Sequence, residues 1–376
     1  MRLILDGNAF INVAISVTKN VTSRDQLVGD TYYVNDLFSE NGYILKEAVR
    51  VSFRNFCFTY LNSLIAPLSS SVSSVHVVFD SKSWRKEYVS NFFKTEETKI
   101  SEFTYKGTRR YEEMHYLFFD YFQKVLTPIL NEKCGINVYR FEGTEGDDII
   151  AHLCETSEED TIIYSVDQDL KQLVTGNGKN VVLILPKQTH KFKRLISPHK
   201  LFKRVSESSE TDDFFSLEDS FDSSSPMEKL TKALKEKGYV EQKIEPHHEF
   251  LTKILLGDKS DNIPKLAGMS PAKATKVIFA LSYEFGDSLI HKLDSLDESA
   301  ILFCVEQIGI VTKTSDETQL NQIREHLVFN IKLMRLATCV FPESIRTALT
   351  DFFSNYSPLR FNRVEFQELK KNQVTL

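Results

Sequence analysis

The chain has 376 residues, of which 41% are hydrophobic and 26% are charged, values that are ordinary for a soluble globular protein of one large or two medium domains. No run of 18 consecutive apolar residues occurs, and Asp6 interrupts the apolar N-terminus, which argues against a membrane span and a signal peptide. The net charge is −6, but residues 206–225 contain seven acids and no base, so the total acidity does not exclude a partner that carries phosphates.

The first half of the chain predicts short strands that alternate with longer helices. The strand candidates are apolar and β-branched; they cover residues 2–5, 75–79, 136–141, 161–164 and 181–185, with an edge hairpin partner at 192–196. Helical patterns cover residues 44–66, 111–130, 147–155 and 170–175. Strands separated by helices of this length predict an α/β fold, with a central, largely parallel sheet flanked by helices.

The composition changes at residue 206. Residues 206–225 combine the seven acids with eight serines, which predicts a flexible linker or surface insertion, with a phosphorylatable regulatory loop as the alternative. Beyond it the pattern is helical, at residues 247–256, 271–281 and in several stretches between 319 and 353. We therefore expect an α/β core over residues 1–205, an insertion over 206–246 and a helical region over 247–376. The five cysteines never form a CxxC pair, which favours reduced core thiols in a cytoplasmic protein.

Acidic residues stand after three of the predicted strands, at the start of one helix and in one later loop. They are Asp6, Asp80, Glu145, Asp147, Asp148, Asp167, Asp169, Asp258 and Asp261. The carboxyl ends of parallel strands meet at one edge of a sheet, where such sheets bind ligands. Each acid alone also fits a turn, a helix N-terminus or a solvated loop. Because several separate segments contribute to the same edge, we expect the acids to form one site.

Such a cluster needs cations. Two carboxylates about 5 Å apart repel by roughly 3 kcal/mol at an effective dielectric constant of ~20, and several such pairs would offset much of a typical stability of ~5–15 kcal/mol. Mg²⁺ or Mn²⁺ suits a site of carboxylates and water, whereas no histidine has the HxH or HExxH spacing that would favour zinc. A carboxylate site with two ions indicates phosphoryl transfer.

The order of these acids resembles the 5′-nuclease (flap endonuclease) superfamily, and most closely the phage 5′-to-3′ exonucleases. The motifs that carry the resemblance are Asp6, Asp80, Glu145-Gly146-Asp147-Asp148, the Ser165-x-Asp167-x-Asp169 block and the Gly257-Asp258-x-x-Asp261-Asn262 block. The resemblance implies a PIN-like core and a first ion at Asp6, Asp80, Glu145, Asp147 and Asp167. It implies a second ion surrounded by Asp148, Asp169, Asp258 and Asp261.

Residues 82–110 carry eight bases against four acids, interleaved with aromatic residues. They resemble the helical arch of that superfamily, which would extend here over residues 82–125. Bases track a nucleic-acid backbone and aromatic rings stack on bases, but the rings of Phe92 and Phe93 are expected in the core. The resemblance implies that Lys106 and Arg109 act on the scissile phosphate. Further nucleic-acid contacts would come from Arg85, Lys86, Tyr105 and Arg110.

Residues 257–281 resemble the helix–three-turn–helix module, which grips a duplex backbone through a monovalent cation such as K⁺. Ser270 and Pro271 suit the N-cap and first position of a helix, whose backbone N–H groups could hold a phosphate. Nucleic-acid contacts are expected from Gly268, Ser270 and Lys273. A purely structural helical hairpin is the alternative.

The resemblance implies an enzyme that removes RNA primers or flaps in DNA replication or repair. Its substrates would be DNA with a 5′ flap or 5′ end and RNA–DNA hybrids, with a ribonuclease H-like activity on the hybrids. We expect a monomer, recruited by a sliding clamp or a single-strand-binding protein, and located in the bacterial host cytoplasm if a phage encodes it. One alternative is a non-catalytic binder of branched DNA. Another takes Asp167-Gln168-Asp169 as the DxD motif of a small-molecule phosphatase.

Overall fold

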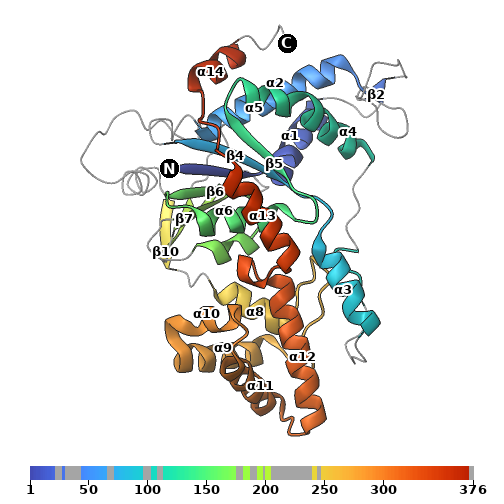
Figure 1. The fold of residues 1–376 in the computed structure, drawn as a ribbon, viewed down its shortest axis with the longest axis vertical. Coiled ribbons are helices and arrows are strands. Elements are labelled where there is room, and N and C mark those ends of the chain that lie inside the picture. The colour runs from blue at the N-terminus through green and yellow to red at the C-terminus, as the bar shows by residue number, and fades with distance from the viewer. Residues whose placement is uncertain are drawn as a thin grey trace, which may run out of the picture.

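The computed structural model describes residues 1–21, 28–29, 44–65, 72–95, 103–107, 113–174, 181–186, 193–197, 200–204, 239–243 and 247–371. The α/β elements lie at one end of an elongated molecule and a group of helices lies at the other (Figure 1). Within the insertion expected over 206–246, residues 239–243 form a strand of the main sheet, and the acidic residues 206–225 lie outside the described residues.

An eight-stranded sheet forms the centre of the α/β part, in the order β10-β9-β8-β7-β6-β1-β4-β5. Strands β7, β6, β1, β4 and β5 are parallel, and β8, β9 and β10 continue the sheet antiparallel. The bounds are β1 Arg2–Asp6, β4 Ser74–Phe79, β5 Ile136–Arg140, β6 Thr161–Tyr164, β7 Val181–Pro186, β8 Lys193–Ser197, β9 Lys200–Arg204 and β10 Tyr239–Lys243. A separate two-stranded sheet pairs β2 Val28–Gly29 with β3 Ile44–Leu45. The predicted parallel sheet is confirmed, whereas β9 and β10 were not predicted because they are short and rich in charged residues.

Helices cover both faces of the sheet. On one face lie α1 Gly7–Val21, α2 Glu47–Ile65, α4 Glu113–Tyr121, the π-helix η3 Phe122–Leu126 and α5 Thr127–Glu132; on the other lie α6 Gly146–Thr156 and α13 Glu343–Asn355. Alternate residues of β1 divide between these two cores: Leu3 and Leu5 pack in the first, and Ile4 packs in the second. This alternation follows from the period of two along a strand. The helix α1 was not predicted, since Asp6-Gly7-Asn8 also fits a turn.

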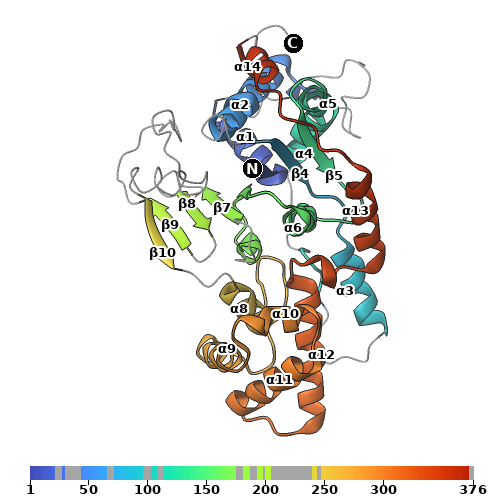
Figure 2. The same ribbon diagram turned by 60° about the vertical axis from the view of Figure 1, so that its left-hand side comes forward.

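The helical part has its own apolar core. It is built by α8 His248–Leu256, α9 Pro271–Phe285, α10 Leu289–Asp294, α11 Glu298–Thr312 and α12 Glu317–Met334. The short 3-10 helix η5 Gly286–Ser288 links α9 to α10, and η6 Thr338–Val340 packs through Val340 against the core beside α6. The helix α3 Trp84–Thr95 and residues of 103–107 pack into this same core. The arch region therefore joins the α/β part to the helical part (Figure 2).

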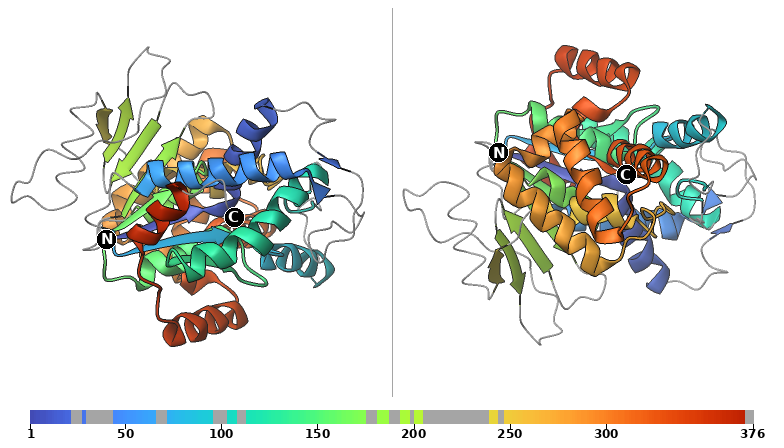
Figure 3. Two further views of the ribbon diagram at one scale, coloured as in Figure 1. Left: turned by 90° about the horizontal axis from the view of Figure 1, so that it is seen from above. Right: turned by 90° about the horizontal axis from the view of Figure 1, so that it is seen from below.

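The chain then returns to the sheet through α13 and α14 Arg363–Lys371. The Asn137 side chain on β5 accepts from the Leu359 N–H (2.8 Å) and donates to the Leu359 carbonyl (3.2 Å). Phe366 is fully buried against Phe58, and α14 lies beside α2 (Figure 3). Gly135 has a φ of +61°, and a Cβ there would lie 1.9 Å from the Arg360 carbonyl oxygen. Residues 341–371 thus belong to the α/β part, which corrects the expected boundary at 247.

The cysteines agree with the expectation of reduced core thiols for four of the five, because Cys57, Cys134, Cys154 and Cys304 are free and buried; Cys339 is free and exposed. Among the described residues, none of the helices combines the length and the apolar character that crossing a membrane requires.

Candidate metal centre and nucleic-acid interface

The carboxyl ends of three parallel strands bring acids to one edge of the sheet. Asp6 is the last residue of β1 and pairs in register with Val78 of β4, so Asp80 lies just beyond it. Leu5 pairs with Tyr164, the last residue of β6, which precedes the acids at 167 and 169. The helix α6 begins at the same edge, with Asp147 in its first turn.

Neutral donors hold three of these acids. Asp6 accepts hydrogen bonds from the Ala9 N–H (3.0 Å) and the Ser165 hydroxyl (2.6 Å). Asp80 accepts one from the Gly146 N–H (2.7 Å). Asp167 accepts one from the N–H of Asp169 (2.8 Å). These bonds orient the carboxylates without neutralising their charge.

The same acids act on one another electrostatically. Burial, together with the charges of Asp80 and Asp167, raises the pKa of Asp6 to about 6, against the lowering by its hydrogen bonds to Ala9 and Ser165. Burial also raises the pKa of Asp147 well above its ordinary value, and Asp167, Asp6 and Asp80 add to this effect. Among the described residues, no ion pair engages Asp6, Asp147 or Asp167. These acids therefore lie close enough to affect one another's ionisation, and their gathering around a metal ion stays a prediction.

A second group of acids has internal lysine partners. Lys253 of α8 pairs with Asp258 (2.6 Å) and also with Asp169. Burial and the charge of Asp167 raise the pKa of Asp169 to about 6, although Lys253 lowers it. Burial would raise the pKa of Asp258, but Lys253 and Ser260 bring it below its ordinary value.

Lys106 lies beside the remaining two acids of this second group, Glu145 and Asp261. Its Nζ lies 2.7 Å from Glu145 and 3.9 Å from Asp261. Burial would lower the pKa of Lys106, but Glu145 and Asp261 raise it overall, so the ammonium stays charged. Lys106 therefore lies beside two of the candidate acids, and its action on the scissile phosphate stays a prediction.

Asp148 has a structural role that the sequence did not reveal. Its side chain is fully buried and accepts from the Trp84 indole (3.1 Å), the Arg85 guanidinium (2.9 Å) and the backbone N–H of Glu145 (3.0 Å). Arg85 is 1% exposed and also donates to the Leu333 carbonyl. Asp148 and Arg85 thus pair with each other inside the protein. The metal binding of Asp148 and the nucleic-acid contact of Arg85 stay predictions.

Tyr105 is also a buried residue, at 3% exposure, and not a surface for stacking on bases. Its hydroxyl lies 3.1 Å from Glu145 and 3.2 Å from Asp261. The backbone N–H of Lys106 donates to the Asp261 carbonyl, and Asn262 donates to the Thr104 carbonyl. Residues 103–107 thus hold the loop after α8 in place through these hydrogen bonds. The nucleic-acid contact of Tyr105 stays a prediction.

The other arch residues have mixed outcomes. Lys86 is exposed on α3, in keeping with a nucleic-acid contact, which stays a prediction. Arg109 and Arg110 lie outside the described residues. Phe92 and Phe93 pack on Phe329 of α12, with ring centroids 4.3 and 6.3 Å away, which confirms the expectation that they lie in the core.

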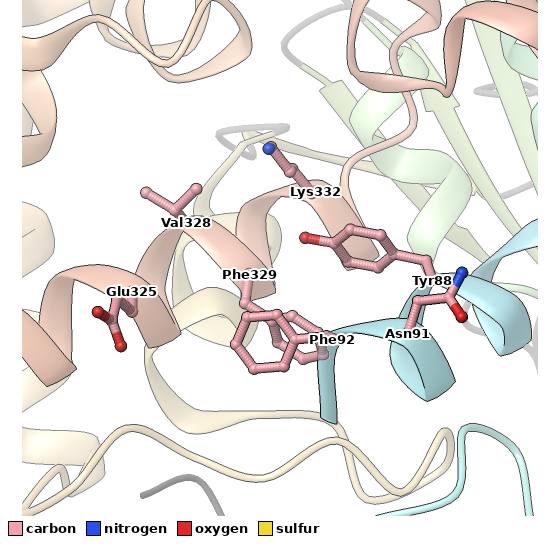
Figure 4. A pocket seen from close by; sticks show the side chains of 7 residues that line it. All are labelled: Tyr88, Asn91, Phe92, Glu325, Val328, Phe329 and Lys332. Atoms are coloured by element: carbon pink, nitrogen blue, oxygen red, sulfur yellow. The ribbon is translucent and has the colours of Figure 1, made fainter. Parts of the chain in front are cut away.

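Tyr88 takes part in the same packing. It stacks on Phe329 at 5.4 Å, and Figure 4 shows both rings beside Phe92 and Lys332 in a pocket of about 380 Å³ between α3 and α12. The aromatic residues of α3 therefore attach this helix to the helical part.

The loop between α8 and α9 has a defined conformation. Gly257 has a φ of +71°, and a Cβ there would lie 2.4 Å from the Ile263 carbonyl oxygen. Asp258 and Ile263 exchange backbone hydrogen bonds of 3.0 and 2.7 Å across the loop. This closed turn presents Asp258 to Asp169 and Lys253.

The start of α9 agrees with the prediction in position but not in every contact. Ser270 is the N-cap and Pro271 the first residue, yet the Ser270 side chain makes no capping hydrogen bond. Lys273 donates to the carbonyl of Gly268, which has a φ of +71°. The contacts of Gly268, Ser270 and Lys273 with nucleic acid, and a K⁺ ion there, stay predictions.

The donor set suits a hard divalent ion. Its acids supply only carboxylate oxygens, and burial with mutual repulsion raises the pKa of Asp6 and Asp147. In the part of the chain that the structure describes, no three His, Cys, Asp or Glu side chains are gathered as in a finished metal site. Carboxylates that repel one another are expected to stand apart until a cation draws them together.

Comparisons with known proteins find one family model that matches part of the chain. Residues 45–206 match the 5′-3′ exonuclease, N-terminal resolvase-like domain. Three solved bacteriophage T5 structures are similar over 99% of this chain: the D15 protein with metal ions (15% identity, 97% of that chain, TM-score 0.47), the 5′-exonuclease with zinc (14%, 98%, 0.46), and the D15 flap endonuclease pseudo-enzyme–product complex with DNA and metal ions (15%, 99%, 0.49). No curated protein sequence matches the chain.

Proposed function

We propose that the chain, whose residues 45–206 match the 5′-3′ exonuclease, N-terminal resolvase-like domain, is a divalent-metal-dependent nuclease that hydrolyses phosphodiesters at a 5′ end or a 5′ flap. One observation carries the proposal: Asp6, Asp80, Asp147 and Asp167 lie at the carboxyl edge of the sheet, where the pKa of Asp6 and that of Asp147 are raised by burial and by the neighbouring acids. Such a group is suited to divalent cations, and divalent cations at carboxylates are suited to phosphoryl transfer.

The acids divide into two binding regions in this proposal. Asp6, Asp80, Asp147 and Asp167 would hold the first ion. Asp169, Asp258 and Asp261 would hold the second, with Glu145 next to Lys106 between the regions. Bound Mg²⁺ or Mn²⁺ would supply an activated hydroxide and stabilise the leaving oxygen.

The chain's own cations would orient the substrate. Lys106 keeps its ammonium group beside Glu145 and Asp261, so a phosphate that reaches this point meets a fixed positive charge. Arg109 would reinforce it from the arch, and Lys86 would contact the backbone of single-stranded nucleic acid. Gly268, Ser270 and Lys273 would hold the duplex backbone at the start of α9.

The test uses a labelled DNA duplex with a 5′ flap and the full chain in Mg²⁺. We expect cleavage near the base of the flap, and Asp167→Asn should slow it at least about 100-fold, as losses of charge-stabilising groups do. Asp351→Asn, on the exposed face of α13, is the matched control and should cleave at the parent rate.

Other results would contradict the proposal. Equal rates for Asp167→Asn and the parent would exclude the mechanism. Flap binding in EDTA, with no cleavage by any divalent ion, would favour the non-catalytic binder of branched DNA. A parallel substrate with an RNA segment at the 5′ end tests the removal of RNA primers.

A further inference from the structure

We propose that Lys253 is an internal counter-ion that holds the place of the second divalent ion between Asp169 and Asp258 and must leave before that ion binds. The inference rests on the proposed nuclease function and goes beyond it, because it assigns unequal metal affinities to the two groups of acids. It arises from a contrast within the site, between acids that have neutral donors and acids that have lysine partners.

The position of Lys253 is fixed by the helix that carries it. It lies in the last turn of α8, whose C-cap is Gly257, and the closed turn that follows brings Asp258 back to its ammonium group. The Lys253 side chain is 21% exposed and that of Asp258 is 8% exposed. The pair is therefore a contact inside the site and not a surface ion pair of the weak, solvated kind.

The oxygen atoms of Asp258 show why the lysine and a metal ion would compete. Its Oδ1 already accepts from the backbone N–H (2.8 Å) and the hydroxyl (2.6 Å) of Ser260. Its Oδ2 is the atom that Lys253 contacts, at 2.6 Å. The oxygen that Ser260 leaves for a cation is thus the one that the ammonium holds.

Asp169 is the second carboxylate for which Lys253 and a metal ion would compete. The same ammonium contacts its Oδ1, so one positive charge bridges two carboxylates that come from different parts of the chain. One ammonium offsets only one of the two negative charges, and a divalent ion would offset both. Exchange of Lys253 for a divalent ion is therefore favourable in charge but requires the side chain to swing away.

Three acids of the first group have no such partner in the part of the chain that the structure describes. Asp6 is held by Ser165 and a backbone N–H, and no ion pair among the described residues involves Asp6, Asp147 or Asp167. A first divalent ion at these three acids thus displaces no paired ammonium group, whereas a second one displaces Lys253. The expected consequence is one tight ion and one weak ion.

The experiment counts bound Mn²⁺ by electron paramagnetic resonance on the full chain at pH 7.5, without nucleic acid. The variants are Lys253→Met, Lys253→Gln and Lys253→Arg. Lys171→Met is the matched control, because Lys171 also reaches α8, where it pairs with Glu249 outside the proposed ligands. Thermal unfolding in EDTA establishes that each variant is folded, and the two neutral replacements guard against one that is not.

We expect the second Mn²⁺ to bind at least about tenfold more tightly in Lys253→Met and Lys253→Gln, because a unit positive charge next to the ion has gone. Lys253→Arg and Lys171→Met should keep the parent affinity, and the first ion should be unaffected throughout. An unchanged second affinity in both neutral variants, or an equal gain in Lys171→Met, would overturn the role of Lys253. Absence of any bound Mn²⁺ in the parent would instead overturn the proposed function as well.

Discussion

At the start of α6, two adjacent aspartates have opposite surroundings. Asp147 meets the charges of Asp167, Asp6 and Asp80, and its pKa is raised by burial and by these acids. Asp148 accepts hydrogen bonds from Trp84 and Arg85 on the far side of the helix. Successive residues of a helix point about 100° apart, so one residue can serve chemistry while the next serves structure.

This difference predicts opposite effects of the same substitution. Asp147→Asn removes a buried, repelled charge, so we expect the metal-free protein at pH 8 to gain about 1–3 kcal/mol of stability while cleavage falls sharply. Asp148→Asn leaves Arg85 buried without its partner and should lose about 3–5 kcal/mol. Urea unfolding in EDTA measures both. A loss of stability in Asp147→Asn as large as that in Asp148→Asn would contradict the proposed charge repulsion.

His76 on β4 predicts a loss of stability in acid. Its ring is fully buried, with Ser74 and Tyr139 as hydrogen-bond partners, and burial first and Arg2 second lower its pKa to about 3. Below the ordinary value of about 6.5 the unfolded chain binds a proton that the folded chain refuses, so stability present above pH 6.5 is lost as the pH falls.

From this one residue we expect a loss of about 2 kcal/mol between pH 7 and pH 5. The acids with raised pKa act in the opposite direction, so the difference between parent and variant isolates the histidine. Urea unfolding of His76→Gln should show a flatter pH dependence than the parent. The exposed His291→Gln is the control and should follow the parent curve. Parallel curves for His76→Gln and the parent would refute the assignment.

Among the structural elements, the sequence predicted best those with a local signal. The parallel strands and the acids at their ends follow from apolar runs and from residue order, and both appear in the structure. The burial of Arg85 could not be predicted. The sequence around an arginine looks the same whether its side chain contacts a phosphate or a buried acid such as Asp148. The return of residues 341–371 could not be predicted either, because the contact between Asn137 and Leu359 spans 222 positions and leaves no local pattern.

Because residues 341–371 return to β5, we expect the side-chain amide of Asn137 to contribute to the stability of the protein. Asn137→Ala removes the bonds to Leu359 and to the Tyr356 hydroxyl, and we expect a loss of about 1–3 kcal/mol because buried polar groups remain unpaired. Limited proteolysis should then cut between α13 and α14 sooner than in the parent. Asn355→Ala, at the exposed end of α13, should not change the rate of cutting. Equal proteolysis of Asn137→Ala and the parent would show that other contacts hold the segment.

For the molecule as a whole, the acidic site links stability to metal and pH. The pKa of Asp6 and that of Asp169 are each raised to about 6, chiefly by burial, so protons bind the folded site more tightly than the unfolded chain. Their contribution to the stability of the metal-free protein is present at low pH and lost as the pH rises through 6.

Mg²⁺ should therefore stabilise the protein more at pH 8 than at pH 5, where protons occupy the same carboxylates. At a concentration of about 100 times the dissociation constant the gain is about 2.7 kcal/mol at pH 8. Thermal unfolding with Mg²⁺ or EDTA at both pH values measures it. A shift of equal size at both pH values would mean that the ion binds elsewhere.

The late return of the chain to β5 also bears on how the protein is made. β5 is an edge strand of the sheet, and the segment around Leu359 that bonds to its Asn137 side chain leaves the ribosome 222 positions after Asn137. At about 5–20 residues per second this interval lasts roughly 10–45 s, during which the edge strand lacks these partners. Bare edges pair with other chains, so synthesis is the period in which this protein most needs a chaperone.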